Sequence, residues 1–481
     1  MSIPLSHLKG KSLGVFGLAR SGLATVKAAV SGGARVYAWD NREDARAKAA
    51  GEGVTLQEPG EWPWEELAAL ALAPGVPLTH PEPHPIVGMA RGAGVEILCD
   101  AELLFRELEG KARFVAITGT NGKSTTTALI GHLFGEAGIA VEVGGNIGRS
   151  ALDLAAPSAS EPVSGHVPEH VYVLELSSYQ LDLCHRLRPN VAVWLNLTPD
   201  HLDRHGDMAG YRLAKERIFA KMGGDDLAVL GIDETDMEEV AVALSERAQA
   251  PRLARVTVRE RDAADIRVDD AGQMTDARNG ERLDLSAFPS LRGRHNWQNA
   301  ACAYAAVREL GVPVSQIAAG MASFPGLEHR MQIVGRHGKV LFVDDSKATN
   351  ADAAAPALAT FQPVYWIVGG RPKAGGIHGL SGFFPRVAKA YLIGEAADEF
   401  SATLAARVPH VIAGELARAV RMAAEDAALD PEDEPVVLLS PAAASFDQFP
   451  DFEARGRAFV AAVNALDDAS AQQAALSETA S

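Results

Sequence analysis

Short apolar runs alternate with amphipathic or alanine-rich stretches along almost the whole chain. Runs at 12–16 and 36–39 open the sequence, further runs recur from 114 onward, and the alternation begins again at 340. Strands that alternate with helices in this way are typical of parallel sheets. The pattern therefore predicts an α/β protein with more than one core, because 481 residues are too many for a single ordinary domain.

Changes in composition divide the chain into three predicted domains. A charged stretch at 101–112 predicts a boundary near 110, and Phe324-Pro325-Gly326-Leu327 has the composition of a linker. An Ala-Pro-Ser-Glu-rich stretch predicts a surface insertion at 154–170, and short β-like pieces predict a sheet-edge extension at 250–290. We predict an N-terminal Rossmann-like domain at 1–110 and a central P-loop mononucleotide-binding domain at 111–326. A C-terminal Rossmann-like domain at 327–466 and a disordered tail at 467–481 follow.

The strongest chemical signal lies between an apolar run at 114–117 and an amphipathic helix. The intervening sequence is Gly119-Thr120-Asn121-Gly122-Lys123-Ser124-Thr125. Backbone amides in such a turn, with a helix N-terminus behind them, bind phosphate; the lysine neutralises the outer phosphates and the serine hydroxyl can ligate Mg²⁺. The first glycine of the usual P-loop spacing would fall at 117, which is Ile. An ordinary turn with a chance Gly-Lys-Ser is the alternative.

A second glycine turn occurs near the N-terminus. Gly17-Leu18-Ala19-Arg20-Ser21-Gly22 follows the run at 12–16, a helix is predicted at 23–30, and Asp40 ends the next run. This resembles a dinucleotide-binding fingerprint, except that its middle glycine is Ala19. We expect a nucleotide there, not specifically NAD, with Asp40 and Arg42 near its ribose or phosphate.

Polar groups follow other apolar runs, where the carboxyl ends of parallel strands line a ligand crevice. Glu175 is poorly explained as a core residue and suits a Mg²⁺ ligand beside the phosphates. His201, in Asp200-His201-Leu202-Asp203, fits the same logic. Further polar loops follow runs in the last third of the sequence, at 344–350, 369–373 and 440–447.

Composition narrows the class of protein. The formal net charge of −17 argues against a nucleic-acid surface, and makes lysines in glycine-rich loops local exceptions. Cys99, Cys184 and Cys302 lack metal-ligand spacing and indicate a reducing compartment. We find no signal peptide and no 18-residue apolar run, so we expect a cytoplasmic protein without a membrane partner.

The residues alone leave three other functions open. They are a P-loop kinase or ATPase without ligation, a nicotinamide-dependent oxidoreductase built on the Gly17 turn, and a catalytically silent nucleotide-binding regulator. Ala19 and the second phosphate loop argue against the oxidoreductase.

Taken together, the motifs resemble the Mur ligase family of bacterial cell-wall synthesis over nearly the whole chain. The irregular phosphate loop also matches the family form. Asp345-Ser346-Lys347-Ala348-Thr349-Asn350 resembles the family member that adds D-glutamate. The other specific matches are Gly144-Gly-Asn-Ile-Gly, Glu175-Leu-Ser-Ser-Tyr-Gln-Leu, Asp200-His-Leu-Asp-Arg and Ser440-Pro-Ala-Ala-Ala-Ser-Phe-Asp-Gln-Phe.

The resemblance implies ATP-dependent amide formation between UDP-N-acetylmuramoyl-L-alanine and D-glutamate through an acyl phosphate. It implies two Mg²⁺ ions and a CO₂-derived carbamate on Lys215, although the charged run around Lys215 alone favours a solvated helix lysine. It also implies small-molecule partners, no nucleic acid, and a monomer.

Residue by residue, the resemblance implies the following roles. The catalytic residues are Lys123, His201 and Lys215, and the metal-binding residues are Ser124, Glu175, His201 and Lys215. ATP is bound by Gly119, Thr120, Asn121, Gly122, Lys123, Ser124, Thr125, Asn296, Asn299, Arg330 and Asp345. The UDP-sugar is bound by Gly17, Ser21, Asp40, Arg42, Asn146, Ser177 and His201, and D-glutamate by Lys347, Thr349, Lys373, Ser445 and Phe452.

Overall fold

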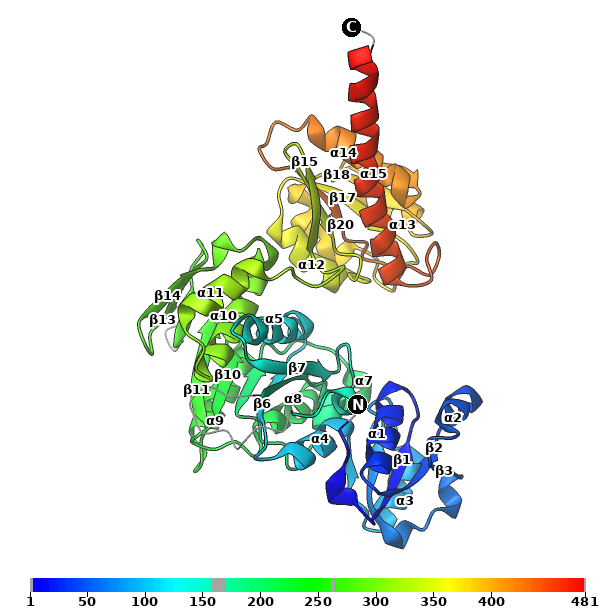
Figure 1. Ribbon diagram of the computed structural model, residues 1–481. Helices are drawn as coiled ribbons and strands as arrows, with labels where there is room; N and C mark the ends of the chain where they lie inside the picture. The colour runs from blue at the N-terminus through cyan, green and yellow to red at the C-terminus, as the bar shows by residue number, and fades with distance from the viewer. Residues whose placement is uncertain (1–2, 158–169, 261–263, 480–481) are drawn as a thin grey trace. The chain divides into compact units, whose positions relative to one another are not determined.

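A computed structural model describes residues 3–157, 170–260 and 264–479. Most of the insertion predicted at 154–170 therefore lies outside the described residues. The chain forms two compact units: the first contains 1–287 and 296–323, and the second contains 288–295 and 324–481 (Figure 1). The described part has three sheets, two in the first unit and one in the second, and parallel pairing dominates each of them. The predicted α/β class is confirmed.

The N-terminal sheet is parallel throughout, with strand order β3-β2-β1-β4-β5. Its strands are β1 (Ser12–Phe16), β2 (Arg35–Trp39), β3 (Thr55–Leu56), β4 (Leu67–Leu72) and β5 (Ile97–Leu98). Its helices are α1 (Arg20–Ser31), α2 (Glu43–Ala49), α3 (Pro85–Gly92) and α4 (Asp100–Leu108). Helix α1 begins three residues before the predicted start, because a side chain at Gly22 would approach the Gly17 carbonyl oxygen to 1.8 Å and glycine lets the helix begin against that turn.

The central sheet has nine strands in the order β14-β13-β12-β11-β10-β9-β6-β8-β7. Its parallel strands are β6 (Arg113–Thr118), β7 (Ala140–Gly145), β8 (His170–Glu175), β9 (Val191–Trp194), β10 (Leu227–Gly231), β11 (Arg252–Thr257) and β12 (Ile266–Val268). Antiparallel β13 (Gln273–Asp276) and β14 (Glu281–Asp284) form the predicted edge extension. The helices of this region are α5 (Lys123–Glu136), α6 (Ser178–Leu181), α7 (Leu202–His205), α8 (Met208–Glu216), α9 (Thr235–Ser245), α10 (Arg294–Glu309) and α11 (Val314–Ser323).

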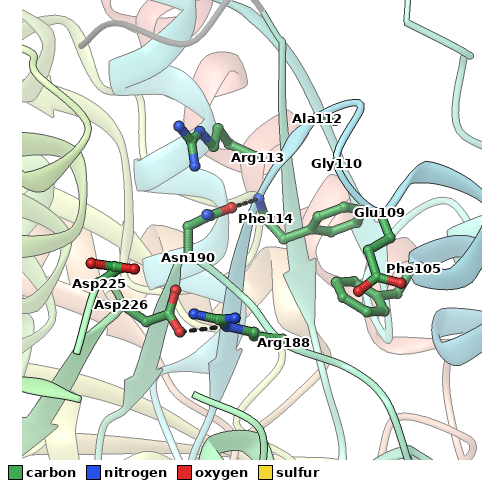
Figure 2. A pocket seen from close by; sticks show the side chains of 10 residues that line it. All are labelled: Phe105, Glu109, Gly110, Ala112, Arg113, Phe114, Arg188, Asn190, Asp225 and Asp226. Carbon is green, nitrogen blue, oxygen red and sulfur yellow. Dashed lines mark hydrogen bonds and ion pairs between the residues drawn. The ribbon is translucent and has the colours of Figure 1, made fainter. Parts of the chain in front are cut away.

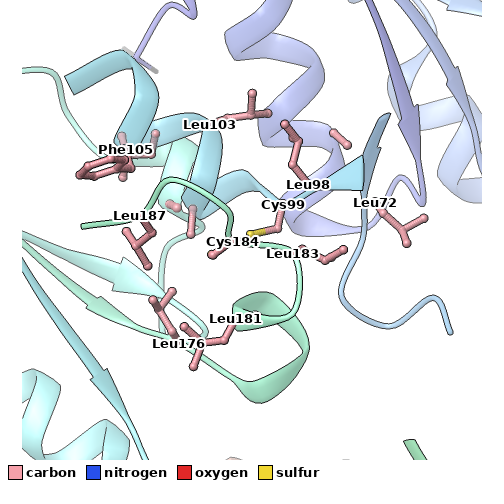
Figure 3. Close-up of a cluster of buried hydrophobic side chains, with 14 of the residues drawn as sticks. Leu72, Leu98, Cys99, Leu103, Phe105, Leu176, Leu181, Leu183, Cys184 and Leu187 are labelled. Carbon is pink, nitrogen blue, oxygen red and sulfur yellow. Dashed lines mark hydrogen bonds between the residues drawn. The ribbon is translucent and has the colours of Figure 1, made fainter. Parts of the chain in front are cut away.

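The first two sheets share one continuous hydrophobic core, which explains why they form a single unit. Leucines from both regions surround two cysteine thiols, and Sγ of Cys99 lies 3.7 Å from Sγ of Cys184 (Figure 3). The buried Glu102 carboxylate of α4 accepts hydrogen bonds from the backbone amides of residues 185–187. These contacts fix α4 to the segment after α6, so the boundary predicted near 110 falls inside one packed unit.

The second unit contains a six-stranded sheet in the order β15-β16-β20-β17-β18-β19, with β15 antiparallel to the rest. The strands are β15 (Gln332–His337), β16 (Val340–Asp344), β17 (Val364–Gly369), β18 (Val387–Ile393), β19 (His410–Gly414) and β20 (Val436–Leu439). The helices are α12 (Ala351–Thr360), α13 (Ala397–Leu404), α14 (Leu416–Ala428) and α15 (Phe452–Thr479). Separate apolar clusters cover its two faces, with α12 and α13 on one and α14 and α15 on the other (Figure 1).

Helix α15 extends over 467–479, where the sequence predicts disorder. Alanine-rich segments have high helix propensity and extend an existing helix without a new nucleation step. Short 3₁₀ turns complete the described secondary structure, at Ser6–Leu8, Pro59–Glu61, Trp64–Glu66, Ala151–Asp153, Arg217–Phe219, Leu285–Ala287, Pro289–Leu291 and His378–Arg386.

Candidate active site

The glycine-rich loop between β6 and α5 has the backbone shape of a phosphate cradle. Gly122 stands at the N-terminus of α5 with φ +81°, a conformation that L side chains rarely adopt. A Cβ at Gly122 would also approach Oδ1 of Asn299 to 2.4 Å. Asn299, in α10, therefore lies against the loop, and its amide nitrogen donates to Oδ1 of Asn296 at 3.4 Å. Two predicted ATP-binding residues are thus held beside the predicted phosphate loop.

Two lysines converge on this loop. The ammonium of Lys123 donates to the carbonyl oxygens of Gly119 and Thr120 at 2.9 and 2.7 Å. Lys215, in α8, donates to the same Gly119 oxygen at 2.8 Å and to the Thr118 hydroxyl at 3.3 Å. The lysines of two separate motifs therefore meet at one carbonyl oxygen. Ser124 and Thr125 lie in the first turn of the helix behind them.

Lys215 is 1% exposed, so the solvated lysine favoured by its charged sequence neighbours is wrong. Its ammonium lies 4.7 Å from the ring centroid of Tyr211, one turn earlier in α8. Burial and the nearby Lys123 charge lower the pKa of Lys215 well below its ordinary value, while Asp200 and Glu175 oppose that shift. An amine with such a pKa is more often neutral and nucleophilic than an exposed lysine.

Glu175, at the end of β8, supplies a buried carboxylate next to this group. It is 2% exposed, and Oε1 accepts a hydrogen bond from the Asn146 amide at 2.9 Å. Its other oxygen, Oε2, is buried with no hydrogen-bond partner among the residues described. A buried carboxylate oxygen left in this way is costly unless a cation or ligand completes its environment. Asn146, predicted to contact the UDP-sugar, orients Glu175.

His201 precedes α7 in a left-handed conformation with φ 53°. Its side chain is 46% exposed, and Nε2 lies 3.4 Å from Oδ2 of Asp200. The ring packs near Tyr179, with 5.0 Å between the ring centroids. An exposed imidazole in a fixed position can meet a ligand, as the sequence predicts. Sequence reasoning missed Tyr179 and Tyr211, because a lone aromatic residue in a helix is indistinguishable from a core residue.

His205 is buried beside the same two tyrosines, Tyr179 and Tyr211. Nε2 pairs with the Ser178 hydroxyl at 2.9 Å, and Nδ1 lies 3.5 Å from Asp182. Burial, with the charge of His201 as a smaller cause, lowers the pKa of His205 to about 4. His205 is therefore neutral at pH 7 and acts as a packing and hydrogen-bonding group.

Ser177, another predicted UDP-sugar contact, forms the N-cap of α6. Its hydroxyl accepts from the Gln180 amide at 3.2 Å, and its own amide donates to the Gln180 side chain at 3.1 Å. This reciprocal capping box fixes the turn after Glu175. The hydroxyl thus has a structural role whether or not it also contacts a ligand.

The N-terminal glycine turn is held by Asp40. Oδ2 of Asp40 accepts from the Leu18 amide at 2.7 Å, and Oδ1 accepts from the Arg42 amide at 2.9 Å. The Arg42 side chain is exposed, and the Ser21 carbonyl accepts from a hydroxyl one turn later in α1. Arg20 donates to the Gly148 carbonyl, which joins the Gly17 turn to the loop that carries Asn146.

In the second unit, the predicted residues Asp345, Lys347, Thr349, Lys373 and Ser445 lie after β16, β17 and β20, strands that are adjacent in the sheet. Arg330 precedes β15, and Phe452 is the first residue of α15. The Lys347 ammonium lies 5.1 Å from the Phe452 ring centroid, and Thr349 donates its amide to the Lys347 carbonyl at 2.9 Å. Ser445 is buried after β20, and Lys373 is exposed after β17. A backbone bridge between Arg371 and Ala444 joins these two loops.

Asp345 is buried beneath these loops. Its carboxylate accepts from the Ser440 hydroxyl at 2.8 Å and the Met331 amide at 3.2 Å. Burial raises the pKa of Asp345 to about 7, with Asp344 adding to the shift and Arg330 opposing it. Sequence reasoning missed the fully buried Arg455, which donates to the Ser346 hydroxyl and carbonyl and to the Ala443 carbonyl.

A hollow elsewhere in the first unit does not resemble a catalytic site. It lies where β6, β9 and β10 begin, at the opposite end of these parallel strands from the phosphate loop (Figure 2). Arg188 pairs with Asp226 at 2.8 Å, and Oδ1 of Asn190 accepts from the Phe114 amide at 2.9 Å. Arg188, Asp226 and Asn190 therefore already form hydrogen bonds that stabilise the fold.

Comparison with known proteins settles the family. The model for the Mur ligase middle domain matches residues 117–307, and that for the Mur ligase glutamate ligase domain matches 329–443. The chain belongs to the Mur ligase family. Family members use ATP, and the phosphate loop described above lies inside the first match.

Curated relatives match almost end to end. A UDP-N-acetylmuramoylalanine–D-glutamate ligase from Rhizobium johnstonii is 50% identical over 472 residues, covering 97% of each chain. A protein of the same name from Caulobacter sp. is 50% identical over 483 residues, covering 98% of this chain and 100% of the relative.

Solved structures show the same fold at much lower identity. MurF ligase from Thermotoga maritima in complex with ADP has a TM-score of 0.57 at 16% identity, with 96% of this chain and 97% of that chain covered. The MurC UDP-N-acetylmuramate–alanine ligase from the same organism has a TM-score of 0.55 at 18% identity, with 95% and 99% covered. Among the described helices of this Mur ligase, none is long and apolar enough to cross a membrane.

Proposed function

We propose that this Mur ligase joins D-glutamate to UDP-N-acetylmuramoyl-L-alanine with hydrolysis of ATP to ADP and phosphate. The observation that carries the ATP-dependent chemistry is the convergence of Lys123 and Lys215 on the phosphate loop, near a Glu175 oxygen that has no hydrogen-bond partner among the described residues. The choice of amino acid rests on relatives of that name at 50% identity.

The reaction forms an amide in two displacements. The alanyl carboxylate attacks the γ-phosphorus of ATP, a new O–P bond forms, and ADP leaves. The amine of D-glutamate then attacks the acyl carbon, phosphate leaves with the bonding electrons, and the amine loses a proton. The protein must hold several anions together, and Lys123 on the loop offsets their mutual repulsion.

The residues present fit Mg²⁺ at this site. Oε2 of Glu175 is buried with no hydrogen-bond partner in the described part of the chain, and Ser124 provides a hydroxyl in the first turn of α5. Both are hard oxygen donors of the kind that Mg²⁺ prefers. We propose Ser124 and Glu175 as ligands of one ion, and His201 as a contributor to a second. Bound there, Mg²⁺ would neutralise charge on the phosphates and polarise the γ-phosphoryl group.

We further propose that Lys215 becomes carbamylated. Its buried amine has a lowered pKa, which raises the fraction of the neutral form that attacks CO₂. A C–N bond would form between Nζ and CO₂, and one proton would pass to solvent. The resulting anion would place an acceptor opposite Lys123 in place of a second cation.

The remaining assignments rest on the resemblance to the family. We propose that the Gly17 turn, Asp40, Arg42, Ser21, Asn146, Ser177 and His201 bind the UDP-sugar. We propose that Asn296, Asn299, Arg330 and Asp345 face ATP, and that Lys347, Thr349, Lys373, Ser445 and Phe452 surround D-glutamate. Two cations and two hydroxyls suit a dicarboxylate, because each carboxylate accepts charge-assisted hydrogen bonds.

We also propose a monomer located in the cytoplasm. Light scattering coupled to size-exclusion chromatography at assay concentrations tests the oligomeric state, and a dimer mass would contradict it.

Phosphate release in the presence of ATP, Mg²⁺ and UDP-N-acetylmuramoyl-L-alanine tests the function. We expect turnover only when D-glutamate is added, with little or none for L-glutamate, L-alanine or a diamino acid. Turnover independent of any amino acid would favour an ATPase or kinase, and preference for another amino acid would overturn the proposed substrate.

A further inference from the structure

Two asparagines flank strand β9. One bonds to the start of neighbouring β6, and the other bonds to the loop that follows β6. Asn190 precedes β9, and its side-chain oxygen accepts from the Phe114 amide near the start of β6 (Figure 2). Asn196 follows β9, and its side-chain oxygen accepts from two amides of the loop that follows β6. Both side chains are half-buried. The two residues therefore perform the same kind of task at opposite ends of one strand pair.

Asn196 is bonded to the phosphate loop more extensively than Asn190 is bonded to β6. Its Oδ1 accepts from the amides of Thr120 at 3.0 Å and Asn121 at 2.8 Å, and its Nδ2 donates to the Asn121 carbonyl at 3.1 Å. A second pair of hydrogen bonds lies beside these: the Thr120 hydroxyl donates to the Thr198 carbonyl at 3.1 Å and accepts from the Thr198 amide at 3.0 Å. The loop is thus anchored to the segment after β9.

This anchoring divides the loop amides between two tasks. The amides of Thr120 and Asn121 point to Asn196 and are engaged within the protein. Helix α5 begins directly behind this anchored half of the loop, and backbone donors at a helix N-terminus favour an anion. A glycine-rich loop has many backbone conformations, and fixing its first half determines where the second half places its donors.

We propose that Asn196 is a positioning residue that holds the phosphate loop in its nucleotide-binding shape. It acts through Thr120 and Asn121 and does not contact ATP itself. The inference rests on the proposed function only in taking ATP as the occupant of this loop.

The test compares Asn196→Ala with the matched control Asn190→Ala in the full-length protein. We expect Asn196→Ala to raise the KM for ATP about 10-fold or more, with the KM for the UDP-sugar changed by less than about 2-fold. We expect Asn190→Ala to leave both KM values within about 2-fold while lowering the melting temperature, because it removes a hydrogen bond far from the loop.

Hydrogen exchange followed by mass spectrometry provides a readout that does not depend on turnover. Peptides covering 118–122 should exchange faster in Asn196→Ala and unchanged in Asn190→Ala, and added ATP should restore protection only partly in the former. If Asn196→Ala does not give folded protein by circular dichroism, Asn196→Ser is tested in its place, because the shorter serine side chain cannot reach both amides. The same changes in the KM for ATP and in hydrogen exchange are then expected.

Equal ATP KM values and equal exchange at 118–122 in the two variants would overturn the role of Asn196. Failure of the proposed function would look different, because the wild type itself would then not ligate D-glutamate. ATP-dependent protection at 118–122 would still report on Asn196 in that case.

Discussion

The two glycine turns of the first unit share a strand–turn–helix topology but have opposite electrostatic character. At the Gly17 turn, a carboxylate from Asp40 accepts the Leu18 amide, so a negative charge lies where a phosphate would bind. At the second loop, the Lys123 ammonium and the Lys215 amine both donate to the Gly119 carbonyl, and the neutral Asn196 side chain holds the turn. The first turn therefore suits hydroxyl and amide groups of a nucleotide, and the second suits a triphosphate.

The difference shows that a glycine turn alone does not define its ligand. Both turns use positive φ at a glycine, +91° at Gly17 and +81° at Gly122. The side chain that satisfies the turn amides sets the local charge, and that side chain comes from a distant strand end in each case. Three substitutions test this contrast, and a fourth tests a buried carboxylate of the second unit.

Removing the cation of the second loop should have the largest effect. We expect Lys123→Ala to lower kcat/KM for ligation about 10³-fold or more, since the lysine offsets charge that develops during phosphoryl transfer. Steady-state phosphate release measures the loss, with the exposed Lys221→Ala as the control of equal charge change. A fall below about 10-fold would show that the loop does not depend on this cation.

Lys215→Ala should reduce turnover about 10²-fold or more, and formate or acetate should restore part of it. The short carboxylate would replace the anion that we propose forms on Nζ. Chloride at the same ionic strength is the control. Recovery with chloride, or full activity of the variant without any addition, would remove carbamylation from the mechanism.

Changing the first turn should affect the other substrate. Asp40→Ala removes the acceptor for two amides, and we expect it to raise the KM for the UDP-sugar about 10-fold while changing the KM for ATP little. Exposed Asp44→Ala, in α2, is the matched control. A larger effect on ATP than on the UDP-sugar would reverse the assignment of the two turns.

The smallest effect concerns Asp345, a carboxylate at a strand end in the second unit whose environment differs from that of Asp40. Its pKa is about 7 in the folded chain, against an ordinary 3.8. The folded state therefore holds a proton that the unfolded state has lost, so this stabilisation is complete below about pH 4 and is lost as pH rises through 7. Asp345→Asn cannot ionise and should escape the loss.

Thermal melting at pH 5 and pH 8 measures the difference. We expect the melting temperature of Asp345→Asn relative to wild type to rise by about 3 °C or more between these values. Parallel pH profiles for the two proteins would show that Asp345 ionises normally in the fold.

Much of the fold and of the candidate site could be predicted from the sequence, because the relevant signals are local. The strands at 12–16, 114–117 and 436–439 are short apolar runs followed by turn residues, and their structures agree closely with the predicted bounds. The phosphate loop is likewise a contiguous motif whose glycines and lysine can be recognised before folding. The sequence predicts a disordered tail at 467–481, and the described residues 467–479 continue helix α15, because helix propensity competes with low hydrophobicity there.

The sequence by itself determined the chemistry that each loop carries, because that chemistry resides in neighbouring residues. Tertiary structure alone decided the burial, pKa and hydrogen bonding of the groups that carry this chemistry. It buried Lys215 and lowered its pKa, left one oxygen of Glu175 without a hydrogen bond to any described residue, and brought Asn196 to the amides of a loop 75 residues away. Burial, pKa and hydrogen-bond pairing depend on groups from distant parts of the chain, and only packing of the sheets brings those groups together.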